Sequence, residues 1–274
     1  MKKFILFILI ITYSVPVFSQ EYQTVSNVHY YDEKTVKSDS YINERCVLDL
    51  YIPKNIKNFP TAIWFHGGGI TGGEKHIPEE LKNKGIAVIA VNYRLSPKVK
   101  APAYIEDAAA ATAWVFKNIK KYGGSEDLIF ITGHSAGGYL ASMVGLNQSY
   151  LKKYAINANR LAGIIPFSGQ MISHFTTRKE KGIDELDARI DEMAPLHFIR
   201  VDAPPLLLIT GDREKELLGR YEENAYMWRM MKLKGHKATV LYELQGFDHG
   251  GMAHPAFPLL LNEIKRVEKL KVMK

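Results

Sequence analysis

The chain has 274 residues, which is enough for one large domain whose core is buried on both faces of a sheet. Its 36 Lys and Arg exceed its 29 Asp and Glu, but they lack the clusters with interleaved aromatics that nucleic-acid binding requires, so we expect no nucleic-acid partner. Cys46 is the only cysteine, which excludes an internal disulfide, and its apolar surroundings indicate a buried strand residue.

The first residues have the composition of a secretory signal peptide. Two lysines precede an apolar stretch, Phe4–Ile11, that is too short to span a bilayer. Val17-Phe18-Ser19 then offers the residues that a signal peptidase accepts at positions −3 and −1, with the cut after Ser19. We therefore expect residues 1–19 to be removed, and residues 20–274 to form a single domain that is secreted or periplasmic and has no stable membrane insertion.

Apolar runs bounded by Gly, Pro and Asn alternate with helical patterns, which is typical of a parallel α/β sheet. The expected strands are Val25–Tyr31, Cys46–Ile52, Thr61–Phe65, Ala87–Asn92, Leu128–Thr132, Gly163–Phe167, Leu206–Thr210 and Thr239–Leu244. The expected helices are Pro78–Lys84, Tyr104–Lys121, Gly138–Asn147, Tyr221–Lys234 and Phe257–Lys269. No helical pattern separates the first two strands, so we expect them to form an antiparallel hairpin at the sheet edge. The sequence predicts an α/β fold with a mostly parallel eight-stranded sheet and helices on both faces.

One long segment, residues 169–198, interrupts this alternation. It is polar and charged between Thr176 and Glu192. Loops of that length usually form a lid or contain helices of their own. The pattern favours equally a small helical lid over the site and a plain surface excursion.

The sequence Gly133-His134-Ser135-Ala136-Gly137 directly follows an expected strand and precedes an expected helix. A strand that breaks into Gly-x-Ser-x-Gly and then a helix predicts a nucleophile elbow, a sharp turn that exposes the serine hydroxyl. Glycine is expected on both sides because a side chain there would collide with the neighbouring strand and helix. Ser135 is therefore the predicted nucleophile.

A serine hydroxyl is a poor nucleophile at neutral pH and needs a general base. His249 lies in Gly246–Gly251, between the last expected strand and the last expected helix, where glycines suit a tight loop that carries an imidazole. His254 is an alternative, but Pro255 and the final helix follow it closely. We expect His249 to be the base.

The acid that orients the base should follow the strand Leu206–Thr210. Many hydrolases with this chain order read Gly-x-x-Asp here, and that spacing selects Glu214. Asp212 is shorter and closer to the strand end, so it remains open as an alternative. Asp248 adjoins the base, but neighbours in an extended loop point apart, which makes it the third choice.

The segment His66-Gly67-Gly68-Gly69 follows the strand Thr61–Phe65 and predicts an oxyanion hole. Consecutive glycines leave the N–H groups of Gly68 and Gly69 free to bind an oxyanion together with the N–H of Ala136. The Walker pattern, Gly-x-Gly-x-x-Gly, His-Glu-x-x-His and Cys pairs are all absent from the sequence, so we expect no cofactor and no metal site.

Taken as a set, these motifs resemble the α/β-hydrolase superfamily, close to its hormone-sensitive-lipase-like carboxylesterases and its acetylxylan and feruloyl esterases. The resemblance covers the chain from Val47 onward, and the strings that carry it are His66–Gly69, Asn92–Pro97, Ile105–Ala108, Gly133–Gly138, and Ala203–Pro205 leading to Gly211 and Asp212. The resemblance implies the α/β-hydrolase fold. It also implies that Arg94 and Asp107 pair behind the oxyanion loop and support the site. The region before Val47 is too short for the helical cap of the lipase-like esterases, so we expect a site open to large substrates.

The resemblance implies an exported serine carboxylesterase that acts on a small-molecule or polysaccharide-linked ester, such as an acetyl or feruloyl group on a polysaccharide. One alternative is a serine peptidase of the prolyl-oligopeptidase type, which shares the fold and the triad order but usually carries a large propeller, for which this chain has no room. Another is a non-catalytic binding protein with the same fold. Such proteins typically lose the serine, the histidine or the oxyanion glycines, all of which are present here.

Overall fold

The computed structural model describes residues 20–272, so the expected signal peptide lies outside the described residues. The strands are β1 (Tyr22–His29), β2 (Val47–Pro53), β3 (Phe59–Phe65), β4 (Ala87–Val91), β5 (Gly124–His134), β6 (Gly163–Phe167), β7 (Leu206–Gly211) and β8 (Thr239–Leu244). The α-helices are α1 (Glu33–Ser38), α2 (Ser40–Arg45), α3 (Ala103–Asn118), α4 (Ala136–Leu146), α5 (Gln148–Lys152), α6 (Phe175–Glu180), α7 (Arg220–Leu233) and α8 (Ala253–Val272). Short 3₁₀ helices are η1 (Glu79–Leu81), η2 (Ile119–Tyr122), η3 (Ala158–Arg160) and η4 (Pro195–Phe198).

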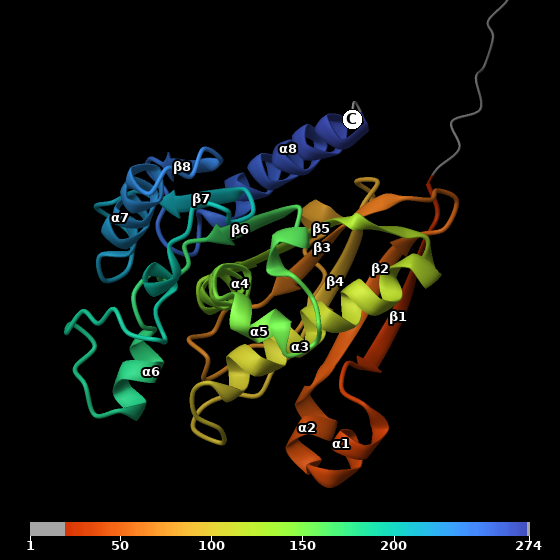
Figure 1. Ribbon diagram of the computed structural model, residues 1–274, viewed down its shortest axis with the longest axis horizontal. Coiled ribbons are helices and arrows are strands. Elements are labelled where there is room, and N and C mark those ends of the chain that lie inside the picture. Colours follow the sequence, from red (N-terminus) through yellow and green to blue (C-terminus); the bar gives the residue numbers. More distant parts are fainter. Residues whose placement is uncertain (1–19, 273–274) are drawn as a thin grey trace, which may run out of the picture.

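All eight strands form one sheet in the order β1-β2-β4-β3-β5-β6-β7-β8 (Figure 1). Strands β3 to β8 run parallel to one another, and β2 is antiparallel to both β1 and β4. The prediction of a mostly parallel eight-stranded sheet is confirmed. Since the carboxyl ends of parallel strands meet at one edge of a sheet, the loops after β3, β5, β6, β7 and β8 gather there.

Side chains that alternate along the strands create one apolar core on each face of the sheet. Along β3, Ile63 and Phe65 join the core that contains residues of α3, α4 and α7. Trp64 faces the opposite way and packs against Phe257 of α8 and Phe167 of β6, with ring centroids 5.3 and 5.7 Å away. Helices therefore cover both faces, with α8 (blue in Figure 1) on the side opposite α3 and α4.

The first two strands pair antiparallel at the sheet edge, as expected, but the prediction that no helix separates them is wrong. Helices α1 and α2 lie between them, each six residues long. Both begin at an aspartate that caps the first turn: the side chain of Asp32 accepts from the N–H of Thr35, and that of Asp39 from the N–H of Tyr41. Helices this short do not develop a readable apolar periodicity.

The expected helix Pro78–Lys84 is also wrong, because only the three-residue η1 forms there. The chain leaves the helical region after η1, since Asn83 and Gly85 adopt φ values of 58° and 79°. Left-handed residues end a helix. The other four expected helices are present with shifted ends, as α3, α4, α7 and α8.

The segment 169–198, expected as a helical lid or as a plain surface excursion, contains α6 and η4. Its helix is docked rather than free: the hydroxyl of Thr176 donates to the carbonyl oxygen of Gly69. The side chain of Arg178 is buried and donates to two carbonyl oxygens of the same segment, those of Ser173 and Glu185. The segment thus has its own helix against the loop after β3, while its movement as a lid stays a prediction.

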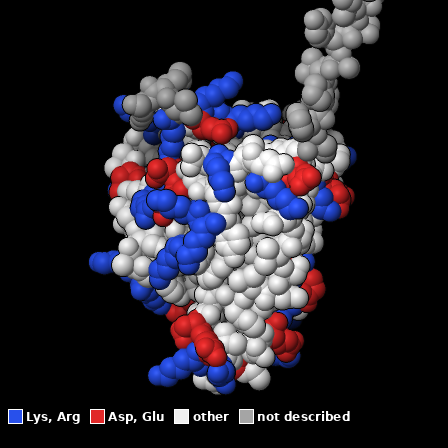
Figure 2. All heavy atoms as spheres, turned by 90° about the vertical axis from the view of Figure 1, so that its right-hand side faces the viewer, with Lys and Arg blue, Asp and Glu red and all other residues white. Residues whose placement is uncertain are grey.

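Charged side chains of both signs are interspersed on the face shown in Figure 2, around an area that is largely uncharged. Among residues 20–272, no helix is both long enough and apolar enough to cross a membrane.

Candidate active site

Ser135 occupies the sharp turn between β5 and α4, with φ 57° and ψ −116°, a backbone conformation that residues other than glycine rarely adopt. Its N–H donates to the carbonyl oxygen of Phe167, at 2.8 Å, which ties the turn to the end of β6. A Cβ atom added to Gly133 or to Gly137 would overlap the carbonyl oxygen of Phe65 on the neighbouring strand. The structure therefore shows the steric reason for both glycines that the elbow motif predicts.

The structure brings His249 to Ser135. His249 lies in the loop between β8 and α8, and its Nε2 is 2.9 Å from the Oγ of Ser135. The alternative, His254, lies in the first turn of α8, where its exposed ring bonds to Glu80. Of the two histidines, only His249 faces the predicted nucleophile.

The carboxylate that faces His249 belongs to Glu216. Its Oε2 lies 2.7 Å from Nδ1 of His249, and only 1% of its side chain is exposed. Its other oxygen, Oε1, accepts from the N–H of Gly211 at 2.8 Å and from the hydroxyl of Ser168 at 2.5 Å. Burial raises the pKa of Glu216, but the hydrogen bonds from His249, Ser168 and Gly211 outweigh it and lower this pKa to about 2. The group is therefore a carboxylate that holds His249 with Nδ1 protonated and Nε2 free to accept a proton.

The prediction of Glu214 or Asp212 as this acid is wrong. The side chain of Glu214 is exposed and makes no bond to His249. The carboxylate of Asp212 closes the loop by accepting from the N–H groups of Gly246 and Glu214, at 2.7 and 3.0 Å. The chain makes a helical turn after β7, in which the N–H of Glu216 donates to the carbonyl oxygen of Asp212. That turn moves the acid two residues beyond the expected spacing, and the longer glutamate side chain reaches back to the strand end.

Asp248, the third choice, points away from the imidazole of its neighbour. Its Oδ1 accepts from the N–H of Gly251 at 2.7 Å and so shapes the loop that carries His249. This matches the expectation that neighbours in an extended loop diverge.

Sequence analysis missed Ser168, the residue that follows β6. Its Oγ lies 2.5 Å from Oε1 of Glu216 and 3.1 Å from Nδ1 of His249, and its φ is 47°. Its N–H donates to Ile209, and its carbonyl oxygen accepts from Nη1 of Arg220, a fully buried side chain. Nothing in its local sequence distinguishes Ser168 from other serines, because its partners come from β7, α7 and two distant loops.

The oxyanion loop, residues His66–Gly69, passes beside the nucleophile: a Cβ on Gly67 would lie 3.5 Å from Cβ of Ser135. Gly68 and Gly69 have φ values of 111° and 62°, and the carbonyl oxygen of Gly68 accepts from two N–H groups further along the loop. Within residues 20–272, the N–H groups of Gly68 and Gly69 donate to no protein acceptor. The N–H of Ala136 belongs to the first turn of α4, where helix geometry leaves N–H groups without an internal acceptor. The predicted oxyanion donors thus lie on the two segments that meet at Ser135.

Two further histidines flank the site and are held neutral by burial. Burial lowers the pKa of His66 and of His134 to about 4. His134 donates from Nε2 to the carbonyl oxygen of His249, at 2.7 Å, and this bond fixes the loop between β8 and α8 that carries His249. His66 stacks on Tyr93, whose hydroxyl donates to the carbonyl oxygen of His66.

Arg94 and Asp107 pair as the resemblance implies. The guanidinium of Arg94 donates from Nε and Nη2 to the two oxygens of Asp107, at 2.9 and 2.8 Å, and its backbone N–H adds a third bond. The side chain of Asp107 is fully buried, so this two-pronged pair fixes the loop after β4 to α3. In the described part of the chain, no group of three or more His, Cys, Asp or Glu side chains is placed to hold a metal ion.

Comparison with known proteins gives one matching family model and several named relatives. The family model described as BD-FAE matches residues 48–223. Curated relatives include the probable carboxylic ester hydrolase LipM of Mycobacterium tuberculosis, 29% identical over 56% of this chain and 40% of LipM. Esterase LipC of the same organism is 25% identical over 76% of this chain and 57% of LipC. The chain spans about half the length of these curated relatives.

Solved structures resemble the whole described fold. A truncated carbohydrate esterase from gut microbiota superposes with a TM-score of 0.73 and 21% identity, over 92% of this chain and 98% of that one. Esterase B from Lactobacillus rhamnosis superposes with a TM-score of 0.72 and 19% identity, over 92% of this chain and 88% of that one. At this level of identity the likeness concerns the fold, and it confirms the α/β-hydrolase fold.

Proposed function

The chain belongs to the BD-FAE family, and from this premise we propose that it is a carboxylic ester hydrolase in which Ser135, His249 and Glu216 act as a catalytic triad. One observation carries the proposal: an unbroken path of hydrogen bonds, 2.9 and 2.7 Å long, joins a serine on a nucleophile elbow to a buried carboxylate through one imidazole. Curated relatives that are named ester hydrolases support the reaction class.

Acylation begins when Nε2 of His249 accepts the proton of Ser135 while Oγ attacks the carbonyl carbon of the ester. Glu216 stabilises the imidazolium that forms and keeps the ring in its orientation. The oxygen of the tetrahedral intermediate receives hydrogen bonds from the N–H groups of Gly68, Gly69 and Ala136. When the intermediate collapses, the C–O bond to the alcohol breaks, and the imidazolium gives its proton to the departing oxygen.

Deacylation repeats the sequence with water. The imidazole of His249 removes a proton from water, the hydroxide oxygen attacks the acyl carbon, and Ser135 leaves with the proton from His249. The products are a carboxylic acid and an alcohol. Because Glu216 is a carboxylate at any pH well above 2, it supports both half-reactions under ordinary conditions.

The proposed substrate is an acyl group esterified to a carbohydrate. Support comes from the carbohydrate esterase of gut microbiota, which this chain covers almost entirely. Export through the expected signal peptide, residues 1–19, belongs to the same proposal, since polymeric carbohydrate is too large to enter a cell intact.

The test is turnover by the protein from residue 20 onward on p-nitrophenyl acetate, acetylated xylan, methyl ferulate and a peptide anilide. We expect ester hydrolysis that Ser135→Ala abolishes and that Ser38→Ala, a change of an exposed serine on α1, leaves intact. Cleavage of the anilide without any ester hydrolysis would indicate a peptidase instead. Silence on all four substrates would indicate a binding protein.

A further inference from the structure

A cleft of about 640 Å³ opens between three segments that the mechanism does not use. Its walls are Thr71, just after the oxyanion loop, the stretch from Ser96 to Lys100 after β4, and α6 with the turn that follows it. The cleft is therefore formed jointly by the body of the fold and by the segment 169–198.

One wall of this cleft is in direct contact with the oxyanion loop. The ring of Phe175 packs over Gly69, where an added Cβ would lie 3.1 Å from its Cζ atom. The hydroxyl of the next residue, Thr176, bonds to the carbonyl oxygen of the same glycine. An ester whose carbonyl oxygen is held by Gly69 consequently has one of its two ends beside the Phe175 ring.

The opposite wall is fixed to α6. Glu180 accepts from the N–H of Ala101 at 2.9 Å and from the hydroxyl of Tyr104 at 3.5 Å. Tyr104 in turn bonds to Thr177, at 2.6 Å. These bonds fix the two walls relative to each other, and a preformed site binds at a lower entropic cost.

The lining of the cleft selects the chemistry of its occupant. Phe175 and Pro97 are its apolar members, and a long acyl chain requires a predominantly apolar wall. Lys100, Lys179 and Glu185 are exposed at the cleft, and none of the three has an ion-pair partner within 4.0 Å among residues 20–272. One aromatic ring surrounded by exposed charged groups fits a ligand that has an apolar face and hydroxyl groups along its edge.

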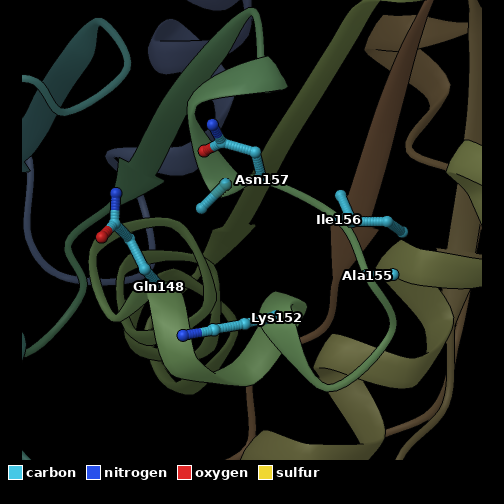
Figure 3. Close-up of a pocket in the computed structure, with 6 residues that line it drawn as sticks. Gln148, Lys152, Ala155, Ile156 and Asn157 are labelled. Carbon is cyan, nitrogen blue, oxygen red and sulfur yellow. The ribbon is translucent and has the colours of Figure 1, made fainter.

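We propose that this cleft binds the sugar residue that carries the scissile ester, with its C–H face on Phe175 and its hydroxyl groups on Lys100 and Lys179. This inference rests on the proposed ester hydrolysis and names the group on the alcohol side. A different pocket, shown in Figure 3, is unsuited to the role: it measures about 310 Å³ and is lined by Gln148, Lys152 and residues 155–158, none of which belongs to the triad or to the oxyanion loop.

The experiment compares kcat/KM on an acetylated xylo-oligosaccharide with kcat/KM on p-nitrophenyl acetate, which has no sugar. The variants are Phe175→Leu, which keeps an apolar contact on Gly69, and the pair Lys100→Ala with Lys179→Ala. We expect Phe175→Leu and the double lysine variant each to lower the ratio of oligosaccharide kcat/KM to p-nitrophenyl acetate kcat/KM about tenfold, through a higher KM for the oligosaccharide. A tenfold change is the size expected when one charge-assisted hydrogen bond, or an apolar contact of similar strength, is lost. Tyr226→Leu and Lys269→Ala, both exposed and neither among the residues that line the cleft, are matched controls that keep the ratio.

Three outcomes contradict the inference. If the wild type deacetylates the oligosaccharide and the variants keep its ratio, the cleft is not the sugar subsite, although the proposed function stands. If the variants change the preference for acetyl over octanoyl p-nitrophenyl esters and leave the sugar ratio unchanged, the cleft binds the acyl chain. If the wild type hydrolyses aryl esters alone, the carbohydrate substrate itself is wrong.

Discussion

The two halves of the site are built in different ways. The half that carries Ser135 depends on backbone: glycines at 133 and 137 allow β5, β3 and α4 to approach, and the N–H groups of Gly68 and Gly69 donate to no acceptor among residues 20–272. The half that carries the acid depends on side chains, since Glu216 is held by a hydroxyl from Ser168, which a buried arginine supports from α7. The half that depends on backbone leaves a local glycine motif that can be read from the sequence. The half that depends on side chains consists of residues far apart in the chain, which meet only in the folded protein.

The largest effect should come from the backbone half. Ser135→Ala removes the proposed nucleophile and is expected to lower kcat by about 10⁶, as loss of the serine does when a triad acts as a unit. The free energy of unfolding, measured by denaturant titration, should change little, because within residues 20–272 the Ser135 hydroxyl bonds to His249 alone. Residual activity within tenfold of the wild type would exclude Ser135 as the nucleophile.

A smaller loss is expected on the acid side. Glu216→Gln keeps the size of the side chain but removes the charge that stabilises the imidazolium, so kcat should fall on the order of 10⁴. Glu214→Gln is the matched control, since that side chain is exposed, and its steady-state rate should stay within about twofold of the wild type. Equal losses in the two variants would contradict the assignment.

Ser168→Ala changes the acid half of the site alone, since it removes one hydrogen bond to Glu216 and leaves the half that carries Ser135 intact. The lost charge-assisted hydrogen bond corresponds to a decrease in kcat/KM of about ten- to a hundredfold. Ser168→Thr, which keeps the hydroxyl, should recover part of the rate. If Ser168 had a structural role alone, Ser168→Ala would lower the thermal stability and Ser168→Thr would not recover the rate. Thermal unfolding of both variants is therefore the control.

The smallest expected effect is on stability at acid pH. The folded pKa of Glu216, about 2, lies below its ordinary value of 4.5, so its contribution to stability is present above the ordinary value and is lost as the pH falls through the folded one. The stability of the wild type relative to Glu216→Gln should therefore decrease between about pH 5 and pH 2. A difference that stays constant across this range in urea titrations would show that Glu216 is not held as a carboxylate.

The same contrast explains how much the sequence could predict. The mostly parallel sheet and the elbow follow from apolar runs and from glycines that sterics demand, so they are readable without a structure, whereas the crossover that places β4 between β2 and β3 was not predicted. The acid was misplaced because a helical turn after β7 changes the spacing, and a turn of this kind depends on bonds from Asp212 to backbone groups of a distant loop. The short helices α1 and α2 were missed because capping, and not periodicity, defines them.

The hydrogen bond between His249 and Glu216 is observed most directly by proton NMR of the His249 ring in the wild type, Glu216→Gln and Glu214→Gln. A hydrogen bond from Nδ1 to a buried carboxylate places this proton at low field and protects it from exchange. We expect the low-field signal to be present in the wild type and in Glu214→Gln and to be lost or strongly shifted in Glu216→Gln. A signal that survives in Glu216→Gln and disappears in Glu214→Gln would contradict the assignment of Glu216 as the acid.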